Sequence, residues 1–114
     1  YEKGIILSGV SAGAVCWFDW ILSDSKGLGF KPLKGINLIE GSCTPHSSNI
    51  ERINEFKLNI KNNKLPNGIA IDDGVAVVFI DGKPTEVYST VDNQGAYFLD
   101  KNKKINLKEY IKNR

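Results

Sequence analysis

The spacing of apolar residues in the first part of the chain predicts strands and helices in alternation. Residues 4–8 form a short apolar run, which is typical of a buried strand. From residue 12 to about residue 22 apolar side chains recur at helical spacing without an intervening proline, which predicts a helix. Residues 23–32 are polar and contain glycine, as loops do, and the apolar content of 33–40 favours a strand. The chain therefore begins as a strand, a sharp turn and a helix.

A second helix is predicted after the only histidine of the chain. Residues 41–48 have the character of a loop, and His46 lies in it. Asn49 is a typical helix N-cap. The apolar residues that follow it fall on one helical face, namely Ile50, Ile53, Phe56 and Ile60.

Short strands separated by turns are predicted for the rest of the chain. Residues 66–68 form a turn, and 69–71 form a short buried strand that stops at Asp72-Asp73-Gly74. The other predicted elements are a strand over 75–80, a hairpin turn at Asp81-Gly82 into 86–88, a strand over 96–99 and a helix over 107–111. Helices alternate with strands first and hairpins follow, so the pattern predicts an α/β layered domain with some antiparallel edge.

Composition places the chain among ordinary globular proteins. A length of 114 residues allows a single domain, 1–114, and 41% hydrophobic with 25% charged residues is a normal balance. The net charge of +2 is too small to indicate nucleic-acid binding, and no apolar run is long enough to predict a membrane span. Basic residues crowd toward the end, which a solvated helix face or tail would explain: Lys101, Lys103, Lys104, Lys108, Lys112 and Arg114.

Cofactor and disulfide chemistry are not indicated. Cys16 and Cys43 do not form a disulfide framework, and the opening Tyr-Glu-Lys-Gly is not a signal sequence, so a reducing cytoplasm is predicted. One histidine with two distant cysteines lacks zinc spacing. The Gly-Leu-Gly at 27–29 follows no predicted strand and opens no helix, so it is not a nucleotide loop. We therefore expect no metal and no cofactor.

The strongest chemical signal is Gly-Val-Ser-Ala-Gly at residues 9–13, between the predicted strand and helix. A Gly-x-Ser-x-Gly turn in that context presents its serine, here Ser11, above the sheet. The helix N-terminus directs free N–H groups at the same spot, and the backbone N–H of Ala12 is the natural first oxyanion donor. The alternative is a glycine-rich turn whose serine caps a helix.

A nucleophilic serine needs a general base and an acid that orients it. His46 is the one imidazole available, although an exposed loop histidine is the alternative. Asp72 and Asp73 end a buried strand, at the sheet edge where α/β proteins carry their sites, or else they cap a turn. The order Ser, His, Asp excludes a standard α/β-hydrolase, in which histidine comes last. A site built on Cys43 and His46 is a remote alternative, since no elbow surrounds that cysteine.

Four blocks of sequence together resemble the peptidase E family, the S51 group of serine peptidases that contains aspartyl dipeptidase and cyanophycinase. The blocks are Gly-Val-Ser-Ala-Gly-Ala-Val-Cys-Trp-Phe at 9–18, Thr-Pro-His at 44–46, Glu-Arg-Ile-Asn-Glu-Phe at 51–56 and Ala-Ile-Asp-Asp-Gly-Val-Ala at 70–76. The resemblance spans most of residues 4–80 and is strongest at the elbow. It implies a flavodoxin-like, class I glutamine amidotransferase-like three-layer fold, of which this chain would be the C-terminal half.

The resemblance also implies roles for individual residues. Ser11 would be the nucleophile and His46 the base, and Asp73 matches the position of the triad acid, usually a glutamate, with Asp72 as the adjacent alternative. Arg52 falls where the family carries an arginine, and we expect it to bind a substrate carboxylate unless it is a solvated helical residue. The implied activity is hydrolysis after an N-terminal aspartate in short peptides.

The resemblance is compatible with two hypotheses about the function of this chain. One is an active serine peptidase that takes short peptides and no cofactor. The other is a catalytically incomplete fragment, or a non-catalytic α/β module, that needs a partner chain. A homo-oligomer or a partner supplying the N-terminal half is expected in the second case, because a sheet that lacks its neighbours exposes an edge.

Overall fold

A computed structural model describes residues 17–23, 30–90 and 92–112 of the chain. The elements in chain order are β1 (Phe18–Ser23), β2 (Lys31–Lys34), β3 (Ile39–Thr44), α2 (Ile50–Lys61), β4 (Gly68–Ile71), β5 (Val75–Ile80), β6 (Lys83–Ser89), β7 (Ala96–Leu99), β8 (Lys104–Asn106) and α3 (Leu107–Lys112).

Six of the strands form one mixed sheet in the order β2-β1-β3-β4-β7-β8. The centre is parallel, since β3 pairs in parallel with both β1 and β4. The strands at both sides, β2, β7 and β8, join antiparallel to their neighbours. The prediction of an α/β layered domain with antiparallel edges is therefore confirmed.

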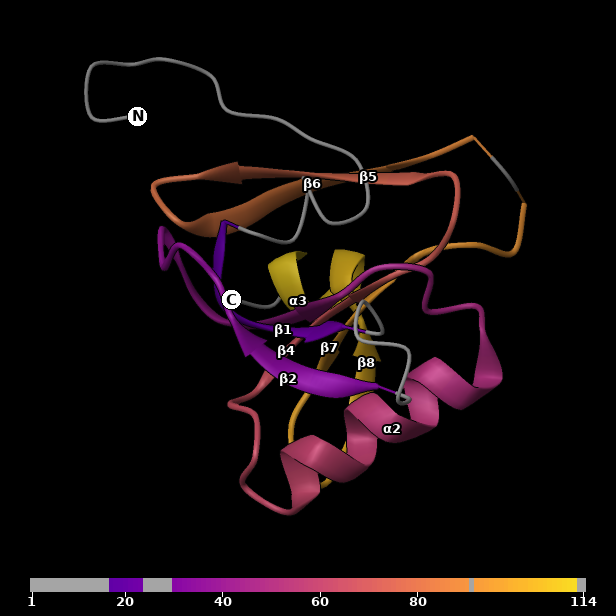
Figure 1. The fold of residues 1–114 in the computed structure, drawn as a ribbon. Coiled ribbons are helices and arrows are strands. Elements are labelled where there is room, and N and C mark those ends of the chain that lie inside the picture. The colour runs from indigo at the N-terminus through magenta and orange to yellow at the C-terminus, as the bar shows by residue number, and fades with distance from the viewer. Residues whose placement is uncertain (1–16, 24–29, 91, 113–114) are drawn as a thin grey trace.

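Both faces of this sheet are covered (Figure 1). Helix α2 lies on one face, and α3 lies on the other together with the two-stranded β5–β6 hairpin. Consecutive residues of β4 point to opposite faces, so that Ala70 packs in the cluster around Phe56 of α2 and Ile69 packs in the cluster around Leu107 of α3. The apolar run of β4 is explained by this burial on both sides.

The predicted helix over residues 12–22 is wrong where the structure describes it. Phe18–Ser23 is strand β1, and residues 12–16 lie outside the described part. The pairing of β1 with β3 shifts register between Phe18 and Trp20. That irregularity sends Phe18 and Ile21 to the α3 face and Leu22 to the α2 face. Because of this shift, apolar residues of β1 that pack in the two clusters lie three and four positions after Phe18, at Ile21 and Leu22. The same spacing is typical of one face of a helix, so the sequence pattern resembled a helix.

The segment from 23 to 48 divides differently from the prediction. Lys31–Lys34 is strand β2, which begins inside the predicted loop, and a connection over residues 35–38 interrupts the predicted strand over 33–40. Strand β3 continues to Thr44, into the predicted loop over 41–48. The reason is that its small polar residues are buried with their hydrogen bonds made: Ser42 Oγ donates to the Pro66 carbonyl over 2.7 Å.

The later elements follow the prediction closely. Helix α2 begins after Asn49, whose side chain accepts from the backbone N–H of Arg52, although Ile50 is exposed. Strands β4, β5, β6 and β7, the hairpin turn and helix α3 are confirmed. Strand β4 starts one residue early, at Gly68, where a Cβ would lie 2.3 Å from the Ser42 carbonyl oxygen. Strand β8 was not predicted. In the described ranges, no helix combines the length and apolarity that a membrane crossing requires.

Candidate active site

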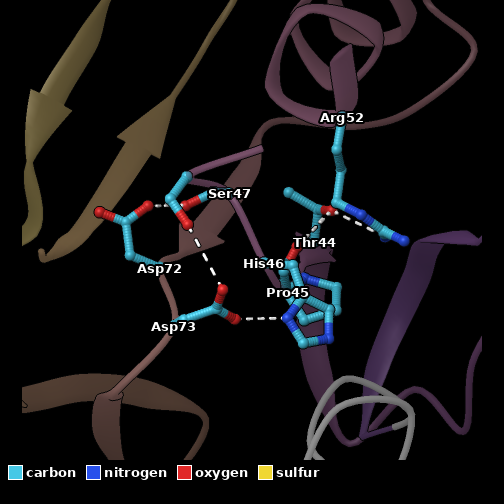
Figure 2. Close-up of polar contacts among 8 residues, drawn as sticks. Thr44, Pro45, His46, Ser47, Arg52, Asp72 and Asp73 are labelled. Carbon is cyan, nitrogen blue, oxygen red and sulfur yellow. Dashed lines mark hydrogen bonds and ion pairs between the residues drawn. The ribbon is translucent and has the colours of Figure 1, made fainter. Parts of the chain in front are cut away.

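His46 and Asp73 meet where two neighbouring parallel strands end (Figure 2). Strands β3 and β4 pair in register at Thr44 and Ala70, so the segments that leave their carboxyl ends run side by side. The imidazole Nδ1 of His46 is hydrogen-bonded to Oδ1 of Asp73. Both side chains are open to solvent, at 47% and 64% exposure. At the carboxyl ends of these two central strands, a solvent-accessible imidazole is thus oriented by a carboxylate, the geometry that a general base would need.

The backbone of His46 adopts a left-handed conformation, with φ of 52°. A non-glycine residue in this region is uncommon, and such residues gather at functional sites. The conformation is held from both sides, because the His46 carbonyl accepts from the Asn49 N–H over 3.0 Å and the Ser47 N–H donates to the Ile71 carbonyl over 3.1 Å. The loop that carries the imidazole is thereby fixed to the end of β4.

Asp72 faces a different set of partners from Asp73 (Figure 2). Its side chain is buried, and Oδ1 accepts from Ser47 Oγ over 2.5 Å. Oδ2 accepts from the Gly95 N–H over 2.9 Å, and the Asp72 N–H donates to the Gly95 carbonyl over the same distance. Of the two adjacent carboxylates, Asp73 is the one that lies at the imidazole, whereas Asp72 joins the His46 loop to the segment before β7.

Arg52 is buried on the first turn of α2. Its Nη1 donates to the Leu22 carbonyl over 3.2 Å and to Thr44 Oγ1 over 3.4 Å. The guanidinium also lies 4.8 Å from the centre of the Phe30 ring. These contacts tie α2 to the ends of β1 and β3, which a solvated helical arginine would not do. The expected role of Arg52 as a substrate cation stays a prediction.

The predicted nucleophile Ser11 and the oxyanion donor Ala12 lie outside the described residues. The structure thus brings the predicted base and the predicted acid together, and the position of the serine stays a prediction. Cys43, the remote alternative nucleophile, is buried in the sheet. Burial raises the pKa of its thiol far above the ordinary value, so the reactive thiolate is disfavoured.

Sequence reasoning missed two serines beside the histidine. Ser47 is buried and satisfies Asp72, and Ser48 Oγ lies 3.5 Å from Asp73 Oδ2. The role of Ser47 could have been predicted from the sequence. A carboxylate that ends a buried strand needs hydrogen-bond donors, and a hydroxyl next to the histidine loop is a short-range candidate.

Comparisons with known proteins cover most of the chain. The sequence model of peptidase family S51 matches residues 1–87. A curated relative, the uncharacterized peptidase YgaJ of Bacillus subtilis (strain 168), is 34% identical over 98 residues. That alignment covers 85% of this chain and 42% of YgaJ, so the chain spans less than half the length of that relative. No solved structure matches the chain. Because the family match covers the elbow, the His46 loop and the Asp72-Asp73 turn, the chain belongs to peptidase family S51.

Proposed function

We propose that this chain carries the catalytic centre of a serine peptidase, with Ser11, His46 and Asp73 as its triad. The observation that carries the proposal is the contact between His46 Nδ1 and Asp73 at an exposed sheet edge, in a chain of the S51 family. A carboxylate on Nδ1 holds the imidazole in the tautomer whose Nε2 can accept a proton. Membership of a peptidase family and a relative named as a peptidase support the same chemistry.

The mechanism assigns one task to each residue. His46 Nε2 takes the hydroxyl proton of Ser11 as Oγ attacks the scissile carbonyl, and Asp73 stabilises the imidazolium that forms. The N–H of Ala12 donates to the oxyanion of the tetrahedral intermediate. His46 then returns the proton to the leaving amine as the C–N bond breaks. Water, deprotonated by the same imidazole, cleaves the acyl-enzyme and restores Ser11.

The proposed substrate is a short peptide with an N-terminal aspartate. Its side-chain carboxylate needs a cation, and Arg52 is the candidate, because a guanidinium can bind a carboxylate through two parallel hydrogen bonds. The contacts of Arg52 with Leu22 and Thr44 favour a supporting role instead. In that case Arg52 holds α2 against the ends of β1 and β3, and another cation binds the substrate.

The finer fold assignment is part of the proposal. The parallel centre formed by β1, β3 and β4, with a helix on each face, supports a flavodoxin-like three-layer arrangement of which this chain is one half. A cytoplasmic location is proposed as well. The alternative function is that of a module whose activity depends on a partner chain or further segment.

Release of free aspartate from Asp-X dipeptides tests the function. The chain is compared with Ser11→Ala, with Asp73→Asn, and with Asp81→Asn, which changes an exposed aspartate in the β5–β6 turn and serves as the matched control. We expect Ser11→Ala to abolish release and Asp73→Asn to lower kcat by roughly 10²–10⁴-fold, while Asp81→Asn retains the rate. Release that survives Ser11→Ala would refute the proposed nucleophile.

A chain that releases no aspartate leads to a second comparison. The same variants are then assayed in the longest natural protein that contains this chain. If the longer protein releases aspartate in a Ser11-dependent way and the chain alone releases none, the alternative function, a module that depends on a further segment or partner chain, would be established. Absence of release in both would overturn the proposed substrate.

A further inference from the structure

A cavity of about 410 Å³ that is open to solvent lies between α2 and the turn that joins β7 to β8. Five exposed lysines line it, Lys57 and Lys61 from the helix and Lys101, Lys103 and Lys104 from the turn and the start of β8. Lys57 and Lys61 are four residues apart and so share one face of α2. Leu58 and Leu99 contribute apolar lining. Three of the six basic residues noted near the chain end thus converge with two lysines distant in sequence.

The shape of the turn is fixed by Asp100, the acidic residue of the cavity lining. Its Oδ1 accepts from the Asn102 N–H over 2.8 Å and from the Lys103 N–H over 2.9 Å. The Asp100 N–H donates to the Lys103 carbonyl over 3.1 Å. This carboxylate is therefore engaged with the backbone and forms no ion pair with the lysines around it.

Within the described part of the chain, no lysine of the cavity forms a direct ion pair with a carboxylate. The ion pairs found there are Lys34 with Asp19 and His46 with Asp73, and neither involves the cavity. The Lys104 ammonium lies 4.2 Å from the centre of the Tyr97 ring, which restricts where it can point. Burial lowers the pKa of Lys104 and the neighbouring charge of Lys57 lowers it further, while the charge of Asp72 raises it. The ammonium groups of Lys57 and Lys104 therefore repel each other.

We propose that this lysine pocket binds a small multivalent oxyanion, a molecule with two or more phosphate or carboxylate groups. Its volume falls within the range of small-molecule sites, roughly 300–1,000 Å³. Lysines act as mobile point charges that suit several oxygens at once. A bound polyanion would add counter-charge beside these lysines and relieve the repulsion between Lys57 and Lys104.

The pocket is separate from the candidate active site. Leu99 pairs with Gly68, the first residue of β4, whereas Asp73 follows the last residue of that strand. The two sites therefore lie at opposite ends of the sheet. The proposal does not depend on the peptidase activity.

Isothermal titration of the chain with tripolyphosphate and, separately, with citrate tests the proposal. We expect saturable one-to-one binding of at least one probe, weakened on raising the salt to about 0.5 M because exposed charges are screened. The variant Lys57→Gln with Lys104→Gln should bind at least about tenfold more weakly, the loss of roughly 1.4 kcal/mol that one charge-assisted contact can account for. The matched control is Lys64→Gln with Lys83→Gln, which removes the same charge from exposed positions outside the cavity and should change affinity by less than about twofold.

Each outcome has a defined meaning. Binding of tripolyphosphate alone assigns a phosphate ligand, and binding of citrate alone assigns a polycarboxylate. Circular dichroism verifies that both double variants are folded, and amide chemical shifts on titration should move at residues 99–104. Absence of saturable binding by both probes would overturn the proposal. Equal weakening in the control would overturn it too, since net charge rather than the pocket would then govern the interaction.

Discussion

Two adjacent aspartates differ in burial at the residue scale, and this difference predicts different effects on stability. Asp72 is 7% exposed and accepts hydrogen bonds from Ser47 Oγ and the Gly95 N–H. Asp72→Ala leaves the buried Ser47 hydroxyl and the half-buried Gly95 N–H without their acceptor, so we expect the free energy of unfolding to fall by about 1–3 kcal/mol. Asp73 is exposed, and Asp73→Ala should change it by less than about 0.5 kcal/mol.

Urea unfolding of the two variants measures this difference. The neighbouring position serves as the control, because each variant removes one carboxylate from the same turn. A loss for Asp73→Ala as large as that for Asp72→Ala would show that Asp73 supports the fold instead of serving only the imidazole.

The buried thiol of Cys43 makes stability depend on alkaline pH. In the unfolded chain the thiol titrates near its ordinary pKa of 9.0, whereas burial raises its pKa in the folded chain. Above about pH 9 the unfolded state therefore binds fewer protons than the folded state, and stability falls as pH rises, by up to about 1.4 kcal/mol per pH unit. We expect the slope between about pH 9 and 10.5 to be shallower in Cys43→Ala. An unchanged slope in chemical denaturation would contradict this assignment.

At the scale of elements, the N-cap of α2 stabilises the helix directly after the His46 loop. The Asn49 side chain accepts from the Arg52 N–H over 3.1 Å. Asn49→Ala should lower the free energy of unfolding by about 0.5–2 kcal/mol. Asn54→Ala is the matched control, an exposed asparagine inside the same helix, and should be neutral or slightly stabilising because alanine has the higher helix propensity. Thermal unfolding followed at 222 nm compares them, and a control that loses as much would argue against the cap.

The same elements show which parts of the fold can be predicted from the sequence. Helix α2 was predicted because its cap and its apolar spacing agree, and β4 was predicted because an apolar run stops at two aspartates. Strand β1 was predicted as a helix because its register shift disrupts the alternation that marks a strand. Strand β8 is three residues long and lies among lysines, so it carries no apolar signal.

The candidate site divides in the same way. His46 and Asp73 were predicted because histidine is unique and the aspartates end a strand. The residue pattern alone left the choice between Asp72 and Asp73 open, because the period of a strand places adjacent residues on opposite sides but does not say which side faces the imidazole. The resemblance to the family was what favoured Asp73. The convergence of lysines from α2 and the β7–β8 turn depends on tertiary packing and was equally inaccessible.

At the scale of the whole molecule, one sheet is shared by two apolar cores. The α2 core contains Phe56 and Ala70, and the α3 core contains Leu107 and Ile69. Because alternate residues of β4 enter the two cores, loss of packing on one face loosens the strand that supports the other. This arrangement predicts that the described part of the chain unfolds as one cooperative unit.

Core truncations on the two faces test this coupling. Phe56→Ala should lower the free energy of unfolding by about 3–5 kcal/mol and Leu107→Ala by about 2–5 kcal/mol, since both side chains are fully buried and leave cavities. Ile50→Ala, at an exposed position of α2, should stay within about 0.5 kcal/mol. In each variant, tryptophan fluorescence, which reports on Trp17 and on Trp20 beside the α2 core, should give the same urea midpoint as far-UV circular dichroism. Two separate midpoints in Leu107→Ala would mean that the α3 layer unfolds independently and that the sheet does not couple its two cores.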